Sequence, residues 1–304
     1  MTRLTADDFH PEVLKLFDRY VHGLLDRSDF IDGASKFTVG SATGLTLLEA
    51  LSPKYTEATQ VQPTDPRISA SFVELDSPAG YGRVRAYMVK PAKIQGKLPG
   101  VLVVHENRGL NPHIEDIARR LALESFIAIA PDALFTLGGY PGDEDQAREL
   151  FSQLDRAKVH LDFLAAANFL KALPDLNGKF GAIGFCFGGG TVNFLATRLP
   201  DLDAAVPFYG NAPPLGDVPE IKAPLLIHYA EHDDRINDQW PGFEAALRAA
   251  GIRYEMYRYP GTQHGFNNDT TPRYSAAAAQ LAWGRTIAFL KLHLMDIPPT
   301  AVRS

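Results

Sequence analysis

Hydrophobic residues follow two different spacings along this chain, and the change falls near residue 67. Before it, residues 11–26 carry apolar side chains three or four positions apart, which predicts an amphipathic helix. Residues 52–66 are rich in Pro, Thr and Gln, as linkers often are. We therefore expect residues 1–66 to be an N-terminal helical leader with a linker, residues 67–296 to be an α/β domain, and residues 297–304 to be a C-terminal tail.

Beyond residue 67, short apolar runs alternate with longer helical stretches. Residues 68–75 and 82–89 alternate apolar and polar side chains on either side of a glycine-containing turn, which predicts an antiparallel β-hairpin. The remaining strands are predicted at residues 100–104, 126–130, 180–184, 204–209, 224–229 and 254–259. Helices are predicted at residues 112–123, 143–173, 187–198, 240–250 and 272–294.

Several of these strands are apolar on both faces, notably residues 101–104, 126–130 and 225–227. A strand needs that pattern when helices cover both sides of its sheet. Strand–helix repetition of this kind predicts an α/β fold with a doubly wound, mostly parallel sheet that opens with the antiparallel hairpin. In such sheets ligands bind beyond the carboxyl ends of the strands, so functional residues are expected there.

One strand end carries a cysteine between two glycines, in the sequence Gly184-Phe-Cys186-Phe-Gly188. A strand, a tight turn and a helix in this order form a nucleophile elbow, which presents its central side chain above the sheet. The glycines stand where a Cβ would collide with the turn. The helix N-terminus favours a thiolate, so Cys186 is the candidate nucleophile and the backbone N–H of Phe187 is a candidate oxyanion donor.

Two structural interpretations of this segment stay open. The glycines could belong to a dinucleotide-binding turn, but the G-x-G-x-x-G spacing is absent and the strand comes late in the chain. Cys186 could also be an inert buried thiol, which is the commoner state of a lone cysteine. Because Cys186 is the only cysteine in the sequence, no disulfide can form within the chain.

A thiol nucleophile in this fold needs an acid and then a histidine later in the chain. Asp233 follows one predicted strand, and His264 follows the last one. We expect both side chains to reach Cys186, because all three residues lie at carboxyl ends of strands. The neighbouring rivals are weaker, since His232 precedes the acid and Asp234 should point away from the site.

These residues resemble the dienelactone hydrolase (carboxymethylenebutenolidase) family of α/β-hydrolases over residues 68–294. The resemblance implies an α/β-hydrolase fold and a Cys186–His264–Asp233 triad that cleaves esters or lactones. It rests on the segments His105-Glu-Asn-Arg-Gly109, Ala130-Pro-Asp132, Gly184-Phe-Cys-Phe-Gly-Gly189 and His264-Gly-Phe266, together with the turn around Asp233.

The resemblance also gives roles to the residues after the early strand. It implies that Glu106 is the partner of the thiol and controls its ionisation, and that the backbone N–H of Asn107 is the second oxyanion donor. An acid at the end of a buried strand is costly unless it is used, which singles out Glu106 independently. The alternative is that Glu106 only pairs with Arg108 or caps the next helix.

Two positions depart from the family pattern. The resemblance implies a carboxylate-binding arginine four residues after His264, where this chain has Asn268. A second arginine is expected early in the helix at residues 143–173, where Asp143-Glu-Asp145 stands and Arg148 is out of register. A substrate carboxylate would lose charge-assisted hydrogen bonds there, so neutral esters or lactones are the expected substrates.

Composition limits the possible partners and locations. The net charge of −6 and the lack of a Lys/Arg-rich run argue against nucleic acid, and no apolar run is long enough for a membrane span. Residues 26–31 and 37–50 together resemble a degenerate twin-arginine export signal that retains only Arg27. We expect a cytoplasmic protein, with the periplasm as the alternative if that leader still works.

The sequence thus predicts a hydrolase that cleaves a small ester or lactone through a thioacyl enzyme, without a metal or organic cofactor. A thioesterase, an acyltransferase or a general carboxylesterase on the same triad stays open. So does a non-catalytic redox or ligand-binding module that uses Cys186. The expected partner is a small-molecule substrate, and the sequence leaves its identity and the oligomeric state open.

Overall fold

The computed structural model describes residues 4–38 and 41–295. The strands are β1 (Ile68–Ser77), β2 (Gly82–Pro91), β3 (Leu98–Val104), β4 (Ile127–Pro131), β5 (Leu176–Phe185), β6 (Ala204–Phe208), β7 (Leu225–His232) and β8 (Tyr254–Gln263). The helices are α1 (Pro11–Val21), α2 (Arg27–Ser35), α3 (Gly44–Leu51), α4 (Tyr55–Ala58), α5 (Pro112–Leu123), α6 (Glu144–Ser152), α7 (Arg156–Lys171), α8 (Phe187–Arg198), α9 (Asp234–Asn237), α10 (Trp240–Ala249) and α11 (Ala276–Leu294).

In the described part of the chain, eight strands form one sheet in the order β1-β2-β4-β3-β5-β6-β7-β8. The hairpin strands β1 and β2 are antiparallel to each other, and β2 is also antiparallel to β4. All later neighbours in the sheet run parallel. The α/β fold with a mostly parallel, doubly wound sheet and an antiparallel N-terminal hairpin is therefore confirmed.

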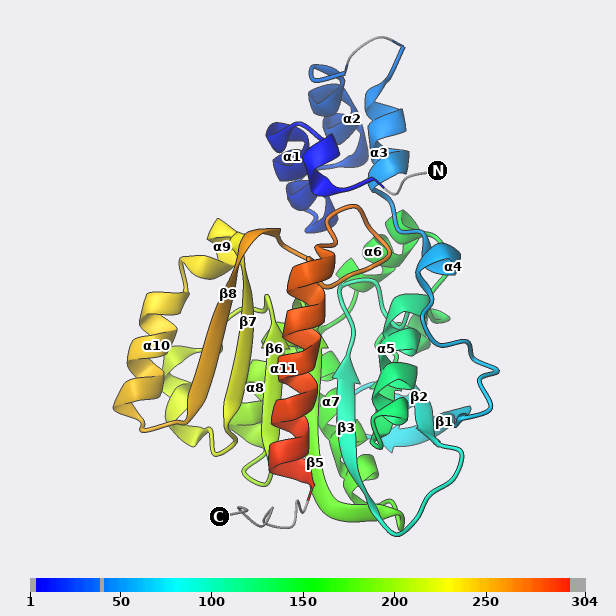
Figure 1. The fold of residues 1–304 in the computed structure, drawn as a ribbon, viewed down its shortest axis with the longest axis vertical. Helices are drawn as coiled ribbons and strands as arrows, with labels where there is room; N and C mark the ends of the chain where they lie inside the picture. The colour runs from blue at the N-terminus through cyan, green and yellow to red at the C-terminus, as the bar shows by residue number, and fades with distance from the viewer. Residues whose placement is uncertain (1–3, 39–40, 296–304) are drawn as a thin grey trace, which may run out of the picture.

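Helices cover both faces of the sheet and enclose two cores (Figure 1). In β3, Val101 and Val103 belong to the core shared with α5 and α11, whereas Leu102 and Val104 belong to the core shared with α7 and α8. All four side chains are buried. A central strand must be apolar on both sides for this arrangement, which explains why its sequence does not alternate.

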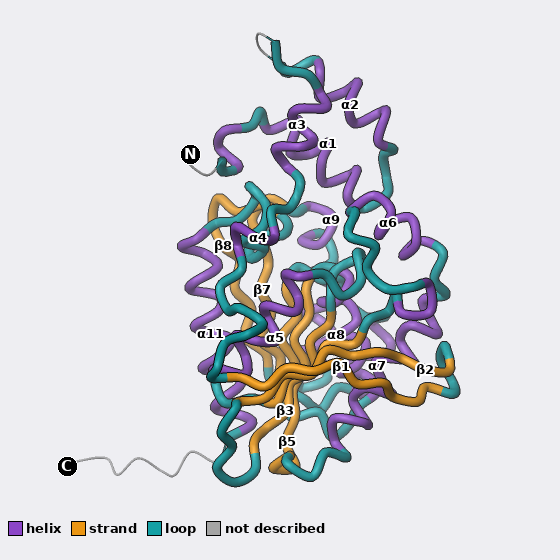
Figure 2. The backbone as a smooth tube through the Cα atoms, turned by 90° about the vertical axis from the view of Figure 1, so that its right-hand side faces the viewer, coloured by secondary structure: helices purple, strands orange, loops and turns teal. Residues whose placement is uncertain are grey.

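The N-terminal helices form a separate group beyond the carboxyl ends of the parallel strands (Figures 1 and 2). Helices α1, α2 and α3 share a core of their own, to which Phe17, Phe30 and Leu51 contribute buried side chains. This edge of the sheet is where ligands bind in doubly wound folds. The N-terminal helices therefore cover the part of the sheet where the chemistry is expected.

Residues 52–66, which their composition predicts to be a linker, are bonded to α5. The carboxylate of Asp116 accepts hydrogen bonds from the backbone N–H groups of Gln60 and Val61 at 3.1 and 2.9 Å. The carbonyl oxygen of Val61 in turn accepts a hydrogen bond from Arg119 at 2.6 Å. The connection between the N-terminal helices and the sheet is thus a fixed segment.

Some segments differ from their predicted form. Residues 143–173 form two helices, α6 and α7, because Asp155 starts a new helix by accepting a hydrogen bond from the N–H of Ala157 at 2.9 Å. The segments that resemble an export signal contribute α2 and α3, with Asp26 as the N-cap of α2. Within the described residues, no helix has both the length and the apolar character that crossing a bilayer requires. The expected tail at 297–304 lies outside the described residues.

The turn between β5 and α8 holds Cys186 in an unusual backbone conformation. Its φ is 56° and its ψ is −112°, and its N–H donates to the carbonyl oxygen of Phe208 at 3.1 Å. A Cβ on Gly184 would lie 2.2 Å from the carbonyl oxygen of Gly188, and one on Gly188 would lie 2.2 Å from the carbonyl oxygen of Val104. These neighbours are backbone atoms that cannot swing aside, so both positions require glycine.

We predict that Gly188→Ala destabilises the fold by about 3 kcal/mol or more, because the added methyl group overlaps the backbone of β3. The matched control is Gly284→Ala in α11, where a Cβ meets nothing within 4 Å. That change should stabilise the protein by about 0.5–1 kcal/mol, the usual gain of alanine over glycine inside a helix. Urea unfolding followed by circular dichroism measures both effects. A Gly188→Ala protein as stable as the parent would contradict the steric argument.

Candidate active site

Asp233 and His264 meet at the carboxyl edge of the sheet. Asp233 follows β7 and immediately precedes α9, and His264 follows β8. The Nδ1 atom of His264 donates to Oδ2 of Asp233 at 2.6 Å, and both side chains are buried. Among the described residues, Nε2 of His264 has no hydrogen-bond partner. This nitrogen is therefore available to a neighbouring reactive group.

The two rival residues lie outside this pair. Asp234 is exposed at the first position of α9. The side chain of His232 is 56% exposed to solvent. The carboxylate that contacts His264 is thus the one belonging to Asp233.

Cys186 lies beside two imidazoles. Its Sγ atom is 3.5 Å from Nε2 of His22, and one ligand atom each of His22, Cys186 and His264 lies within 4.8 Å of the other two. Burial by itself raises the pKa of the Cys186 thiol, but the charges of His264 and His22, together with the hydrogen bond to His22, outweigh burial and lower the pKa to about 5. Burial likewise opposes the charge on His264, whereas Asp233 and Cys186 outweigh it and raise the pKa of His264. The arrangement favours a thiolate next to an imidazolium.

A metal ion could also be held by His22, Cys186 and His264. In the described ranges, no other group of three or more His, Cys, Asp or Glu side chains brings its ligand atoms close enough together for a metal ion. Cys186 lies on a strained turn and His264 is bonded to Asp233, which is also the arrangement that acid–base and nucleophilic chemistry requires.

His22 belongs to no sequence motif, yet its side chain reaches Cys186 from 164 positions earlier in the chain. It follows α1, and its ring packs edge-on against the ring of His264 with centroids 4.7 Å apart. Its Nδ1 atom lies 2.7 Å from the carbonyl oxygen of Asp18 and 3.4 Å from the Asp18 carboxylate. A guanidinium nitrogen of Arg235 lies 3.1 Å from the same Nε2 that faces the thiol.

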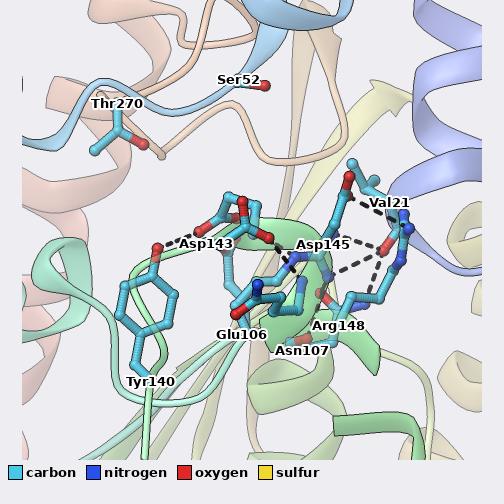
Figure 3. Close-up of polar contacts among 12 residues, drawn as sticks. Val21, Ser52, Glu106, Asn107, Tyr140, Asp143, Asp145, Arg148 and Thr270 are labelled. Carbon is cyan, nitrogen blue, oxygen red and sulfur yellow. Dashed lines mark hydrogen bonds and ion pairs between the residues drawn. The ribbon is translucent and has the colours of Figure 1, made fainter. Parts of the chain in front are cut away.

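The end of α1 is held to the sheet domain through its backbone carbonyl groups (Figure 3). The side-chain amide of Asn107 donates to the carbonyl oxygen of Val21 at 2.9 Å, and the guanidinium of Arg108 donates to the same oxygen at 3.2 Å. The guanidinium of Arg148 donates to the carbonyl oxygen of Tyr20 at 2.7 Å and lies 4.0 Å from the centre of the Tyr20 ring. The end of a helix leaves its last carbonyl groups without partners in the helix, and these bonds satisfy two of them. They also fix the position of His22, the next residue.

Glu106 has a different partner from the one that the resemblance implies. Its Oε2 accepts a hydrogen bond from the side-chain amide of Asn268 at 3.0 Å. Within the described residues, no hydrogen bond joins Glu106 to Cys186, and Arg108 instead lies 3.4 Å from Glu144. The side chain within hydrogen-bond distance of the thiol is that of His22.

Phe187 and Asn107 lie on the wall of a cavity that includes Cys186. Phe187 is the first residue of α8, so its N–H has no acceptor within the helix. Asn107 belongs to the loop after β3. The buried Tyr209 adds a hydroxyl that has no hydrogen-bond partner in the described residues, and its ring centroid is 4.9 Å from that of His264.

Two cavities meet at the thiol. The first, of about 340 Å³, is bounded by the N-terminal helices and the loops after β3 and β4, and it includes Glu106. The second, of about 530 Å³, is bounded by α8 and the loop after β6, and it includes Phe187. Both are lined by His22, Asn107 and Cys186, so His22 stands between them.

Comparisons with known proteins agree with this architecture. The model of the "Dienelactone hydrolase family" matches residues 84–294, and a model described as "YqhI-like" matches residues 1–38. A protein of Escherichia coli K12 named "Putative carboxymethylenebutenolidase" is 34% identical over 249 residues, which cover 77% of this chain and 91% of that protein. The "Putative hydrolase fragment YghX" of the same strain is 58% identical over 113 residues, which cover 37% of this chain and 97% of the fragment.

A solved structure extends the likeness to three dimensions. The "Putative Dienelactone Hydrolase" from Klebsiella pneumoniae aligns with a TM-score of 0.66 and 31% identity, over 73% of this chain and 98% of that one. The family model alone spans well over half of the chain. The chain therefore belongs to the dienelactone hydrolase family and is a carboxylic-ester hydrolase with an α/β-hydrolase fold.

Proposed function

We propose that this chain hydrolyses a small ester or lactone with Cys186 as nucleophile, His264 as general acid and base, and Asp233 as the acid that orients His264. The observation that carries the proposal is geometric: the strained turn presents the thiol at the N-terminus of α8, close to an imidazole whose Nδ1 is already bonded to a buried carboxylate at 2.6 Å. The lowered pKa of Cys186 and the raised pKa of His264 support a reactive thiolate at neutral pH.

The proposed reaction has two halves. The thiolate attacks the carbonyl carbon, a carbon–sulfur bond forms, and the π electrons move to oxygen. Collapse of this intermediate breaks the bond to the alcohol oxygen, which takes a proton from Nε2 of His264. Neutral His264 then takes a proton from water, whose oxygen attacks the thioester and expels the thiolate. The acid product releases its proton to solvent, and the thiolate–imidazolium pair is restored.

The negative oxygen of each intermediate needs donors that are aimed at it. We assign this role to the backbone N–H groups of Phe187 and Asn107, because both residues flank Cys186 on the cavity wall. The N–H of Phe187 lies in the first turn of α8, where the helix also contributes a positive partial charge.

Charges in the first cavity support a neutral substrate. Three arginines line it, and each lies 3.4 Å from a carboxylate, in the pairs Arg27–Asp145, Arg108–Glu144 and Arg273–Asp18. Asn268, which stands where the resemblance implies an arginine, donates instead to Glu106. A substrate carboxylate would have to displace one of these acids or lie beside Glu106, and either arrangement loses charge-assisted hydrogen bonds.

Cys186→Ala should lower kcat for p-nitrophenyl acetate by at least about 10³-fold, because it removes the atom that forms the covalent intermediate. Circular dichroism should show an unchanged fold, since the smaller side chain occupies the same turn. Mass spectrometry of the parent protein, quenched during turnover, should find the acyl group on Cys186. Near-parental activity of the variant would remove Cys186 from the mechanism and leave the thiol as inert or as a sensor.

Asp233→Asn should lower kcat/KM by about 10²- to 10⁴-fold, because the amide no longer stabilises the imidazolium or fixes its tautomer. Asp234→Asn is the matched control: its side chain is exposed on the neighbouring residue, so activity should stay within about twofold, as for most surface changes. Steady-state kinetics on both variants gives the ranking. The opposite ranking would move the catalytic acid by one residue.

A substrate with a methyl-capped carboxylate should be hydrolysed faster than the same substrate with a free carboxylate. The expected difference in kcat/KM is about 10- to 150-fold, since a hydrogen bond to a charged group is worth about 1.5–3 kcal/mol. Kinetics on a matched acid and methyl ester measure it. A tenfold preference for the free acid would contradict the prediction, and Arg273→Gln would then test whether Arg273 exchanges Asp18 for the substrate.

A further inference from the structure

We propose that His22, supplied by the N-terminal helices, is an active-site residue that shares the proton of the Cys186 thiol and takes the place of Glu106 as the group that controls its ionisation. The inference rests on the proposed role of Cys186 as nucleophile. It adds a second acid–histidine pair, Asp18 with His22, to the sulfur that already faces His264.

The contact between His22 and the thiol has the geometry of a shared proton. Nε2 of His22 is 3.5 Å from Sγ of Cys186, which is hydrogen-bond distance for sulfur. The carbonyl oxygen of Asp18, 2.7 Å from Nδ1, can only accept, so Nδ1 carries a proton and Nε2 is the nitrogen that exchanges one. Either the S–H donates to neutral Nε2, or protonated Nε2 donates to the thiolate. The proton moves between these two atoms and no other reactant is needed.

The charges around His22 balance these two arrangements. Burial disfavours its imidazolium, but Cys186 and Asp18 outweigh burial and raise the pKa of His22, while His264 opposes them. The guanidinium of Arg235 at 3.1 Å also favours the neutral ring. The charged and titratable groups that face His22 are thus Asp18 on its own helix, Cys186 at the elbow, Arg235 on α9 and His264 after β8.

Glu106 is anchored elsewhere. The side-chain amide of Asn268 donates to it at 3.0 Å, and Oδ1 of Asn268 is itself fixed by the backbone N–H of Thr270 at 3.0 Å. Asn268 is buried, so its amide is held in this orientation. With Glu106 anchored, His22 is the side chain that lies within hydrogen-bond distance of the sulfur among the residues that the structure describes.

The docking of α1 is tied to the same site. The side chain of Asn107 holds the carbonyl oxygen of Val21, the residue before His22, while the backbone of Asn107 is the proposed oxyanion donor. The carboxylate beside His22 is in turn paired with Arg273 at 3.4 Å. The residues that hold His22 in place are therefore part of the cavity wall around the thiol.

The test is the pH dependence of alkylation in the full-length His22→Gln variant. Cys186 is the only cysteine, so iodoacetamide reports on that thiol alone. In the parent protein the rate should fall only as the pH drops through about 5, because the thiolate persists down to its lowered pKa. Without the imidazole the thiolate loses a cationic partner, its pKa rises, and the midpoint should move up by about one to three pH units. The loss in kcat/KM should accordingly be larger at pH 6 than at pH 8.

His10→Asn is the matched control, because His10 caps the same helix by accepting from the N–H of Glu12 at 3.2 Å and asparagine caps equally well. Its alkylation profile should equal that of the parent. Asp18→Asn is the second variant and should shift the midpoint in the same direction as His22→Gln, including where His22→Gln does not fold. A folded His22→Gln protein with an unchanged midpoint overturns the proposal, as does an unchanged Asp18→Asn profile if only that variant folds. Either result leaves Cys186 as nucleophile, whereas full activity of Cys186→Ala removes the proposed function itself.

Discussion

The backbone conformation of Cys186 is the constraint on which the rest of the site depends. A positive φ in a non-glycine residue is strained, and it occurs here where β3, β5 and α8 approach so closely that Gly184 and Gly188 have no room for a Cβ. The turn places Cys186 at the carboxyl end of β5. Asp233 follows β7 and His264 follows β8, and both strands end at that same edge of the sheet. The sheet therefore brings these two side chains close to the sulfur although all three residues are far apart in the sequence.

The N-terminal helices complete this site from outside the sheet. Side chains of the sheet domain bond the backbone carbonyl groups of Tyr20 and Val21, and the ion pairs Arg27–Asp145 and Arg273–Asp18 join the same two parts of the chain. With α1 docked, the ring of His22 separates two cavities and contacts the thiol. If His22 acts as proposed, the docking of α1 onto the sheet domain has two effects. It covers the site, and it lowers the pKa of the thiol.

The parts that the sequence predicted share a local signal. The doubly wound sheet follows from strands that are apolar on both faces, and Cys186 follows from glycine spacing at one turn. The contact of His22 had no such signal, because His22 and Cys186 are 164 positions apart in the sequence and only the fold brings their side chains together. Composition likewise predicts a connecting segment at residues 52–66 but does not show that Asp116 bonds its backbone.

Asn268 links the missing carboxylate-binding arginine to the hydrogen bonding of Glu106. An arginine there would put a cation beside Glu106 and offer charge to a substrate carboxylate. The neutral amide of Asn268 satisfies Glu106 without adding charge, and no ion pair involving Glu106 exists in the described ranges. Positive charge near the sulfur then comes from the imidazoles of His22 and His264. Both lie close to the thiol, and their charges lower its pKa and so favour the thiolate. An asparagine at this position therefore weakens the case for an anionic substrate, and it fits the proposal that the ionisation of Cys186 depends on histidines, one of which the N-terminal helices supply.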